Sequence, residues 1–353
     1  MTVRTTKSEI DVRSKLAELS KPTGVAGNAL AEKDTVEQQQ EFLGVGRRNQ
    51  IINGDFQISQ RGDYAGGFTM VESTYWIDRW RTRVTNSINA TATHTLNKVR
   101  MEVNANATGS IRIDQKIEIH NSEHLSYKDM TLSALVRSNS TNARLAVYHQ
   151  GWDVRNTQSS GDGEWERLTL TFNTGSLVVG NEFSIQIGLD GVSSANVALY
   201  DGEYVEVKEV QLEFGTTASP FERRLYGEEL ALCERFYQKS YDKDAYVTGA
   251  TSLSSVGSVD HYGTSDATNV LAQVYFRTQM RDAPTVTTYN PNEALSGSAY
   301  PGRAYLVSNS GTASYNTTTN NIGSTGFRTY VPRNGGGWTA HRIIFQWQAV
   351  AEL

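Results

Sequence analysis

Hydrophobic and polar residues alternate through the middle of the chain. Isoleucines occupy positions 111, 113, 117 and 119, and charged residues lie between most of them. A period of two is typical of a strand with one buried face. The pattern recurs at Leu132–Val136, Leu168–Phe172 and Phe183–Leu189. Strands separated by glycine- and serine-rich turns, without helices between them, predict an antiparallel β-sandwich.

The strand expected at residues 204–214 changes its alternation halfway. Its apolar side chains occupy odd positions first and even positions later, namely Val205, Val207, Val210, Leu212 and Phe214. One extra residue in a strand shifts the parity of all residues after it. We therefore expect a β-bulge near Lys208 and Glu209.

The clearest helical spacing of apolar residues follows the sandwich. Leu230, Cys233 and Tyr237 share one helical face, and Glu228 and Glu229 suit the positive end of a helix. This pattern predicts a connecting helix over residues 226–241. Cys233 lacks an activating histidine or a metal motif beside it, so we expect a small core residue rather than a reactive thiol.

Residues 242–353 are again rich in glycine, serine, threonine and asparagine. Strands are expected at 271–276, 303–307 and 341–350, and a long polar loop at 311–324. The segment therefore predicts a second, smaller β-domain.

The first 47 residues differ from the rest of the chain. Their few apolar residues cannot offset an ordering cost of about 1–2 kcal/mol per residue. They contain no apolar stretch typical of a signal peptide, and we expect no membrane-spanning segment. An arm that becomes ordered on docking or oligomerisation is favoured over a freely moving terminus. The sandwich is then expected at 48–225.

Composition narrows the classes of function. The chain has 353 residues, 30 glycines and a net charge of -5, with hydrophobic residues at 38%. A negative net charge argues against nucleic acid as the main partner. The single cysteine excludes intrachain disulfides and zinc sites built from several cysteines. Stability must come from burial or oligomerisation.

Patterns typical of catalysis do not stand out. Asp162, Glu164 and Glu166 are close together around Trp165, but a glycosidase also needs a defined separation of two carboxyl groups across a sugar. A solvated turn is the favoured interpretation. The pair His120 and His124 follows a strand rather than lying on a helix, so a polar turn explains it better than a zinc site. We expect no catalytic residue and no enzyme.

Sugar binding needs an exposed aromatic ring together with amide or carboxylate partners for hydroxyl groups. Tyr148, Trp152 and Asp153 fit best, because Trp152 follows a predicted strand and begins a polar loop. The alternative is that Trp152 caps the core. A second set of aromatic residues lies in or beside the polar loops of the C-terminal region, a composition typical of adaptable recognition surfaces. This set comprises Tyr300, Tyr315, Tyr330 and Trp338.

Trp76 and Trp80 lie four residues apart. We expect them to pack in the core or between domains. Asp78 and Arg79 lie between them and are candidates for a buried ion pair.

Several short motifs resemble known families. Asn53-Gly54-Asp55-Phe56 and Gln211-Leu212-Glu213 resemble the opening and closing strands of jelly-roll carbohydrate-binding modules. Other segments are similar to bacteriophage tail-fibre and tail-collar proteins built on that module. These segments are Gln60-Arg61-Gly62, Tyr75 with Asp78-Arg79-Trp80, Leu230–Tyr237 and Trp347–Leu353. The resemblance covers roughly residues 49–241 and the last few positions.

The resemblance implies a mostly β chain: an extended or helical N-terminal arm, an antiparallel jelly-roll sandwich, a linking helix and a smaller C-terminal β-domain. It implies attachment to glycan or to a virion without catalysis, and a homotrimer. The expected location is the virion, after synthesis in the bacterial cytoplasm. Expected partners are tail, baseplate or collar proteins through residues 1–47 and host cell-surface polysaccharide, without nucleic acid or membrane insertion.

The same resemblance would allow a structural calcium site with Asp55 and Glu213 as ligands. The favoured expectation is that the chain has no cofactor and no metal.

The leading hypothesis is a tail fibre that binds host glycan. A collar, capsid-decoration or other virion protein without a receptor role is the first alternative. A glycan depolymerase is the second.

Overall fold

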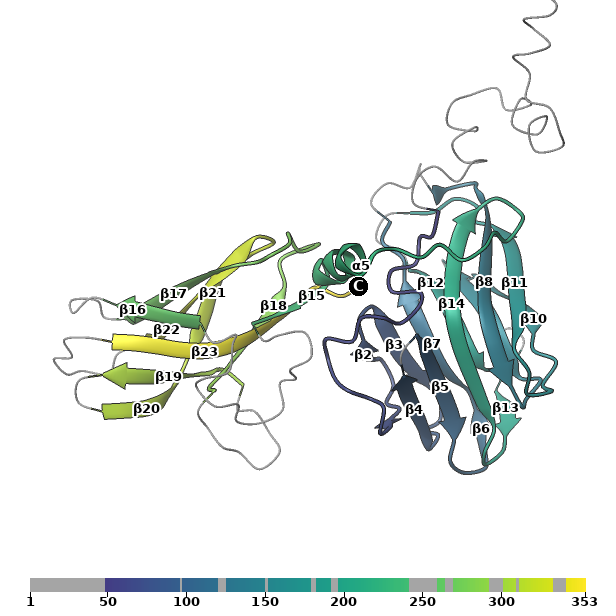
Figure 1. Ribbon diagram of the computed structural model, residues 1–353, viewed down its shortest axis with the longest axis horizontal. Coiled ribbons are helices and arrows are strands. Elements are labelled where there is room, and N and C mark those ends of the chain that lie inside the picture. The colour runs from purple at the N-terminus through teal and green to yellow at the C-terminus, as the bar shows by residue number, and fades with distance from the viewer. Residues whose placement is uncertain are drawn as a thin grey trace, which may run out of the picture. The chain divides into compact units, whose positions relative to one another are not determined.

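The computed structural model describes residues 48–353 except 96, 120–124, 150–151, 179–181, 192–195, 241–258, 264–268, 292–300, 309–310 and 333–340. The predicted arm at 1–47 lies outside the described residues. The residues from Gln50 to Leu353 form one compact unit, and Figure 1 shows its strands and its helix α5 (Tyr226–Glu234).

The first part of this unit is the predicted antiparallel β-sandwich. One sheet has the strand order β1-β4-β5-β14-β8-β11, and the other has the order β10-β9-β12-β7-β3-β2. The first sheet contains β1 (Phe68–Thr69), β4 (Ala90–Thr95), β5 (Lys98–Val103), β14 (Tyr204–Phe214), β8 (Asp129–Ser138) and β11 (Glu166–Asn173). The second contains β10 (Trp152–Gln158), β9 (Ala143–His149), β12 (Phe183–Leu189), β7 (Ile111–Lys116), β3 (Trp80–Val84) and β2 (Thr74–Ile77). Two short strands, β6 (Ala107–Gly109) and β13 (Val197–Leu199), pair with each other.

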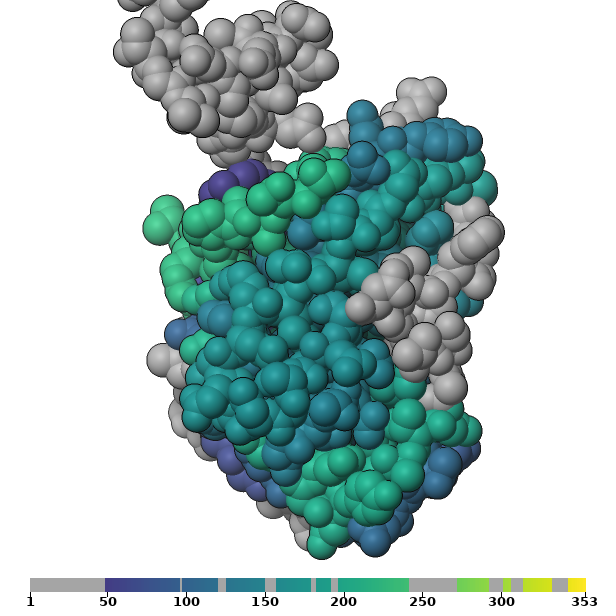
Figure 2. Space-filling view, turned by 90° about the vertical axis from the view of Figure 1, so that its right-hand side faces the viewer, coloured from purple at the N-terminus to yellow at the C-terminus, as the bar shows by residue number. Residues whose placement is uncertain are grey.

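The alternating apolar residues of the sandwich strands are buried, as the sequence pattern predicts. The apolar positions of β7, β8, β9 and β12 pack into one core between the sheets. In Figure 2 segments coloured teal and green make up most of the side of the sandwich that faces the viewer. The bulge in β14 is also confirmed, because the register against β8 shifts between Lys208 and Gln211 and Glu209 has a positive φ of 54°.

Aromatic packing at one end of this core confirms the expectation for the two tryptophans. Trp76 and Trp80 are both fully buried. The Phe56 ring lies 5.0 Å from the Trp80 ring, and the Tyr64 ring lies 5.4 Å from the Trp76 ring. The Trp80 indole N–H donates to the Asn53 carbonyl oxygen at 2.9 Å, so the ring buries no unpaired donor.

The segment Asn53-Gly54-Asp55-Phe56 is a buried turn, and the expectation of an opening strand was wrong. Asn53 has a φ of 59°. Its side-chain Oδ1 accepts from the Ile58 N–H at 2.9 Å, and its Nδ2 donates to the Ile58 carbonyl at 2.8 Å. An asparagine side chain that replaces backbone partners in this way favours a turn over a strand.

The second part of the unit has its own hydrophobic core, and β23 (His341–Val350) runs through its larger sheet. One half of β23 pairs with β16 (Val259–Gly263) and β19 (Arg303–Ser308), and the other half pairs with β15 (Tyr237–Lys239) and β18 (Thr285–Tyr289). The smaller sheet consists, in order, of β17 (Asn269–Tyr275), β22 (Gly326–Pro332) and β21 (Thr318–Gly323). Every second residue of β23 enters the core, namely Ile343, Phe345, Trp347 and Ala349.

Two expectations for this region were wrong. Helix α5 covers only Tyr226–Glu234, and the rest of the predicted helix 226–241 contributes the strand β15, because residues 237–239 pair with residues 348–350 of β23. The expected loop at 311–324 instead contains the strands β20 (Gly311–Asn316) and β21 (Thr318–Gly323). Threonine has a high strand propensity, and Tyr315 and Ile322 of these strands pack against the core. The strands β17 (Asn269–Tyr275) and β22 (Gly326–Pro332) complete the smaller sheet.

A buried ionic cluster, here called the Glu352 junction, joins residues from distant parts of the sequence. It consists of Arg61, Arg79, Phe236, Tyr237 and Glu352. The Glu352 carboxylate accepts from Arg61 Nη2 at 2.7 Å and from Arg79 Nη1. The Arg79 guanidinium lies 3.6 Å from the centre of the Phe236 ring, and that of Arg61 lies 4.0 Å from the Tyr237 ring. Both cations are therefore paired and covered by aromatic faces.

The expected ion pair between Asp78 and Arg79 does not form. These two residues make the turn between β2 and β3, where Arg79 has a φ of 70°. The Asp78 carboxylate accepts from the Gln60 backbone N–H at 2.5 Å and from Gln60 Nε2 at 2.8 Å. Neighbouring residues in a tight turn need not face each other, and here each has a different partner.

Other motif residues contact the same region. The Lys239 ammonium group is fully buried and donates to the Gln60 carbonyl at 2.6 Å. Glu229 of α5 accepts from the Asn53 N–H at 2.5 Å. Cys233 is fully buried, and burial raises its pKa well above the usual value, which confirms a core residue rather than a reactive thiol.

Replacing Glu352 by glutamine tests the junction. The substitution leaves the buried Arg79 without its anion, so the free energy of unfolding in guanidinium chloride should fall by about 3–5 kcal/mol. The matched control is Glu228→Gln, because Glu228 is exposed on α5. A loss in E352Q no larger than that in E228Q would contradict the role of the ion pairs.

Candidate functional site

The outer face of the second sheet carries polar and charged side chains and is here called the polar face. In β7 the isoleucines at 111 and 113 point into the core. Arg112 and Asp114 therefore point outward, because successive side chains of a strand lie on opposite faces. The same argument places Ser184 and Gln186 of β12, Tyr148 of β9 and Arg81 of β3 on this face.

The strand register sets which of these side chains are neighbours. One row crosses five strands, since each residue pairs with the next across the sheet: Ala146, Gln186, Asp114, Arg81 and Tyr75. A parallel row contains Asp153, Tyr148, Ser184 and Lys116. Adjacent strands are about 4.8 Å apart, so the first row contains a continuous line of polar groups from Gln186 through Asp114 and Arg81 to Tyr75.

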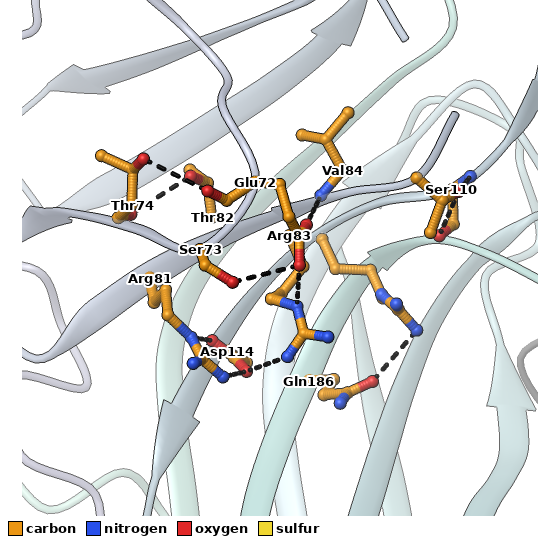
Figure 3. Close-up of polar contacts among 12 residues, drawn as sticks. Glu72, Ser73, Thr74, Arg81, Thr82, Arg83, Val84, Ser110, Asp114 and Gln186 are labelled. Carbon is orange, nitrogen blue, oxygen red and sulfur yellow. Dashed lines mark hydrogen bonds and ion pairs between the residues drawn. The ribbon is translucent and has the colours of Figure 1, made fainter. Parts of the chain in front are cut away.

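Asp114 is the electrostatic centre of the polar face. Arg81 donates to its carboxylate from Nε at 2.9 Å and from Nη2 at 2.5 Å. Arg83 Nη1 lies 3.6 Å from the same carboxylate, and Glu72 pairs with Arg83 Nε at 2.8 Å. Figure 3 shows Arg81 and Arg83 reaching Asp114 from the same side of the sheet. The paired arrangement fixes the positions of the guanidinium groups.

A second ion pair lies beside the first. Arg112 Nη1 donates to Asp190 Oδ2 at 2.8 Å and to Gln186 Oε1 at 3.2 Å. Gly188 pairs across the sheet with Arg112, and a Cβ at Gly188 would lie 2.1 Å from the Ile111 carbonyl oxygen. A residue with a side chain does not fit at this position without a shift of the backbone.

Ser184 is a buried hydroxyl on this face that has no partner. Its side chain is fully buried, and its Oγ makes no hydrogen bond in the described part of the chain. Leaving a buried polar group unpaired costs about 1–3 kcal/mol. Such a group in a native fold needs an explanation, and a polar ligand that displaced the side chains covering Ser184 would supply the missing partner.

Tyr75 connects the polar face to the Glu352 junction. Its hydroxyl donates to the Leu353 carbonyl oxygen at 3.0 Å, and the Arg61 guanidinium lies 5.6 Å from its ring. Burial, and then the negative charge of Glu352, raise the pKa of Tyr75 to about 12.

The candidates near β9 are only partly brought together. Tyr148 is half-buried on the polar face, and its pairing partner across the sheet is Asp153. Trp152 begins β10 rather than a loop, so that part of the expectation was wrong. The short connection after His149 brings the chain straight back as a paired strand.

The C-terminal candidates do not form one described site. Tyr315 lies on β20 and packs against the second core, and Tyr330 lies on β22 in the smaller sheet. Both are half-buried. Tyr300 and Trp338 lie outside the described residues.

The carboxylates in the turn between β10 and β11 organise that turn. Glu166 Oε1 accepts from Ser159 Oγ at 2.5 Å and from the Ser160 N–H at 2.7 Å. Asp162 accepts from the Glu164 N–H at 2.9 Å. These contacts support the interpretation as a turn. His120 and His124 lie outside the described residues.

Asp55 and Glu213 each have a partner within the protein. Asp55 accepts from the Gln57 side-chain amide, and Glu213 accepts from Ser219 Oγ at 2.6 Å and from the Ser219 N–H at 2.8 Å. Within the described ranges, no group of three or more histidine, cysteine or acidic residues could hold a metal ion. The described residues also contain no helix long and apolar enough to cross a membrane.

Most of the polar face could not be predicted from the sequence. The alternation placed Arg112 and Asp114 on an outward face, but it could not distinguish a solvated face from one with buried ion pairs. A signal was present in β12, where Ser184 and Gln186 alternate with apolar residues. Which polar positions meet depends on the strand order, and the sequence does not show that order.

Comparisons with known proteins give no family for this chain. No protein-family model matches the sequence, and no curated protein matches it. A solved structure of TmCBM61 in complex with beta-1,4-galactotriose has 12% identity and a TM-score of 0.30, and the match covers 48% of this chain and 100% of that chain. The enzymatically active domain of bacteriophage CBA120 tailspike protein 4 has 10% identity and a TM-score of 0.31, with 47% of this chain and 21% of that chain covered.

A third solved structure is the CBM22-1 xylan-binding domain from Paenibacillus barcinonensis Xyn10C. It has 12% identity and a TM-score of 0.27, with 45% of this chain and 98% of that chain covered. With TM-scores this low, the sandwich assignment rests on the strand order and the core described above.

Alkaline pH provides a test of the environment of Tyr75. In the unfolded chain tyrosine ionises near its ordinary pKa of 10.0, whereas in the folded protein burial delays ionisation to about pH 12. The stabilising contribution of the protonated side chain is therefore complete below pH 10 and is lost as the pH rises toward 12. Urea unfolding of the Tyr75→Phe variant should show a smaller fall in stability over this interval. Identical pH profiles for the variant and the unaltered protein would contradict the assignment.

Proposed function

We propose that this protein is a structural protein of a bacteriophage virion, a tail fibre that binds host surface glycan through its β-sandwich and attaches to the particle through residues 1–47. The motif resemblance supports the virion part of the proposal. The observation that carries the glycan part is the row of polar groups that crosses the second sheet from Gln186 to Tyr75.

The chemistry of the polar face suits a sugar chain. Sugar hydroxyls need both donors and acceptors in fixed positions, and here the guanidinium groups donate while Asp114 and Gln186 accept. Tyr75 and Tyr148 add aromatic surface at opposite ends of the face, of the kind that packs against the C–H face of a pyranose. The Ser184 hydroxyl supplies a further group whose hydrogen-bonding capacity is unused among the described residues.

The same arrangement favours binding over hydrolysis. A glycosidase uses one carboxyl group as an acid and a second as a base or nucleophile. The Asp114 carboxylate is occupied by Arg81 and lies close to Arg83, and Asp190 is paired with Arg112. Carboxylates held by arginines are suited to orient a ligand by hydrogen bonding, so we propose no turnover of the glycan.

A second candidate function is a collar or capsid-decoration protein without a receptor role. The observation that favours it is the position of the motif residues. Asn53, Gln60, Arg61, Asp78 and Arg79 lie in or beside the Glu352 junction rather than on the polar face. Competition for host cells separates the two functions. An excess of the purified protein should block phage adsorption if the protein is a receptor-binding fibre, and should have no effect if it is a decoration protein.

Replacing Ser184 by alanine gives opposite expectations for stability and binding. Loss of a buried, unpaired hydroxyl should leave the free energy of unfolding unchanged or raise it by about 1 kcal/mol. Loss of a ligand hydrogen bond should weaken binding to host surface polysaccharide by about two- to tenfold. Calorimetric titration and chemical denaturation measure the two effects.

The control for this variant is Thr108→Ala, which removes an exposed hydroxyl from β6. If S184A binds host surface polysaccharide as tightly as T108A does, Ser184 is not part of the proposed site. Cleavage products in the titration mixture would instead support a depolymerase.

The proposed fibre should be a homotrimer. Light scattering coupled to size-exclusion chromatography should give three times the chain mass of 39.0 kDa. A monomer at micromolar concentration would contradict the fibre assignment, because fibre proteins depend on association for rigidity and for multivalent binding.

A further inference from the structure

The outer face of the first sheet carries a second set of charged side chains, here called the cationic face. In β14, Glu206 pairs with Arg100 of β5 on one side and with Arg137 of β8 on the other. Lys208 follows two residues later on the same face and pairs with Leu135. Arg167 of β11 pairs with Leu135 from the other side. These outward residues form a row that crosses strands β5, β14, β8 and β11. Among the described elements, no helix covers this row.

Glu206 lies beneath the cations. Its carboxylate is 2.6 Å from Arg137 Nη2, 3.3 Å from Lys98 Nζ and 3.5 Å from Arg100 Nη1. The Glu206 side chain is 4% exposed, whereas those of Lys98, Arg100 and Arg137 are 35%, 29% and 33% exposed. The anion therefore fixes the three cations from below, and an incoming ligand meets the cations first.

Aromatic rings hold the same cations against the sheet. The Arg100 guanidinium lies 3.7 Å from the centre of the Tyr204 ring. Lys208 Nζ lies 4.2 Å from the Trp165 ring, and the Arg137 guanidinium lies 5.3 Å from it. A cation stacked on a ring loses part of its conformational freedom before a ligand binds, which lowers the entropy cost of binding.

Uncharged hydroxyl groups border the cations on both sides. Thr91 and Thr93 of β4 pair with Glu102 and Arg100 of β5. Thr169 and Thr171 of β11 are exposed at the opposite edge of the sheet. The surface thus combines fixed positive charges with rows of groups that both donate and accept hydrogen bonds.

We infer that the cationic face binds an acidic polysaccharide, a glycan chain that carries carboxylate groups between hydroxyl-bearing positions. The cations match the carboxylates, and the threonines match the hydroxyls. This inference rests on the first sheet, whereas the proposed function rests on the second, so each face can be tested without the other.

Nucleic acid fits this surface less well. A single strand binds by stacking its bases on free aromatic rings beside a cationic groove, and it has few hydroxyl groups for the threonines to contact. Here Glu102, Glu206 and Glu209 lie among the cations, and the whole chain has a net charge of -5. The rings of Trp165 and Tyr204 already have cations over them, which leaves less aromatic surface for bases to stack on.

The test measures binding of the full chain to immobilised polygalacturonate, with neutral pullulan as the reference polysaccharide. The protein should bind polygalacturonate at low ionic strength, and about 0.5 M NaCl should weaken that binding strongly, because screening shortens the range of charge interactions. Lys208→Gln should weaken it by about two- to fivefold, the range for one partly exposed ion pair. In the described part of the chain the cationic partners of Glu206 are Lys98, Arg100 and Arg137, so this change leaves the buried carboxylate paired.

The matched control is Lys128→Gln, which removes the same charge from an exposed position before β8. K128Q should bind polygalacturonate as the unaltered protein does, whereas K98Q/K208Q should be weaker than K208Q alone. Equal binding to polygalacturonate and pullulan would overturn the inference. So would equal losses in K208Q and K128Q, or tighter binding to a single-stranded DNA of the same charge.

Discussion

The carboxylate of Glu352, buried between Arg61 and Arg79, is the interaction on which the rest of the structure depends. A buried guanidinium group is tolerated only when it is paired, and Arg79 is 1% exposed. Its other guanidinium nitrogen donates to the Lys116 carbonyl at 2.6 Å, at the end of β7. The pair thus fixes the β2–β3 turn, the segment after α5 and the end of β23 relative to a central strand of the polar face.

The two sheets of the sandwich use the same rule of alternation in different ways. In each sheet one set of residues forms the shared core, and the other set is left for outward chemistry. On the polar face the charges pair within the surface layer, around Asp114 and Arg112. On the cationic face the carboxylate of Glu206 lies below its partners, so the positive groups are outermost. The first arrangement suits hydroxyl-rich ligands, and the second suits anionic ones.

The sequence was sufficient to predict strands whose alternation depends only on burial of one face, including the β14 bulge. It was insufficient where distant partners decide the outcome: residues 237–239 leave the helix because β23 pairs with them. Asn53 appeared to begin a strand because side-chain bonds that stabilise a turn leave no periodic pattern. The threonine-rich strands β20 and β21 were mistaken for a loop because polar composition is common to both. The Arg79–Glu352 pair spans 273 positions, which no local pattern can indicate.

The most decisive measurement is a crystal structure of the full chain with an oligosaccharide fragment of the host surface glycan. The sugar should lie across β9, β12, β7 and β3, with hydroxyl groups bonded to Ser184, Gln186 and Asp114. The Glu352 junction should be unchanged between the free and bound proteins. Sugar density only on the C-terminal strands or at the ends of the sandwich, with the polar face empty, would rule out glycan binding by the polar face.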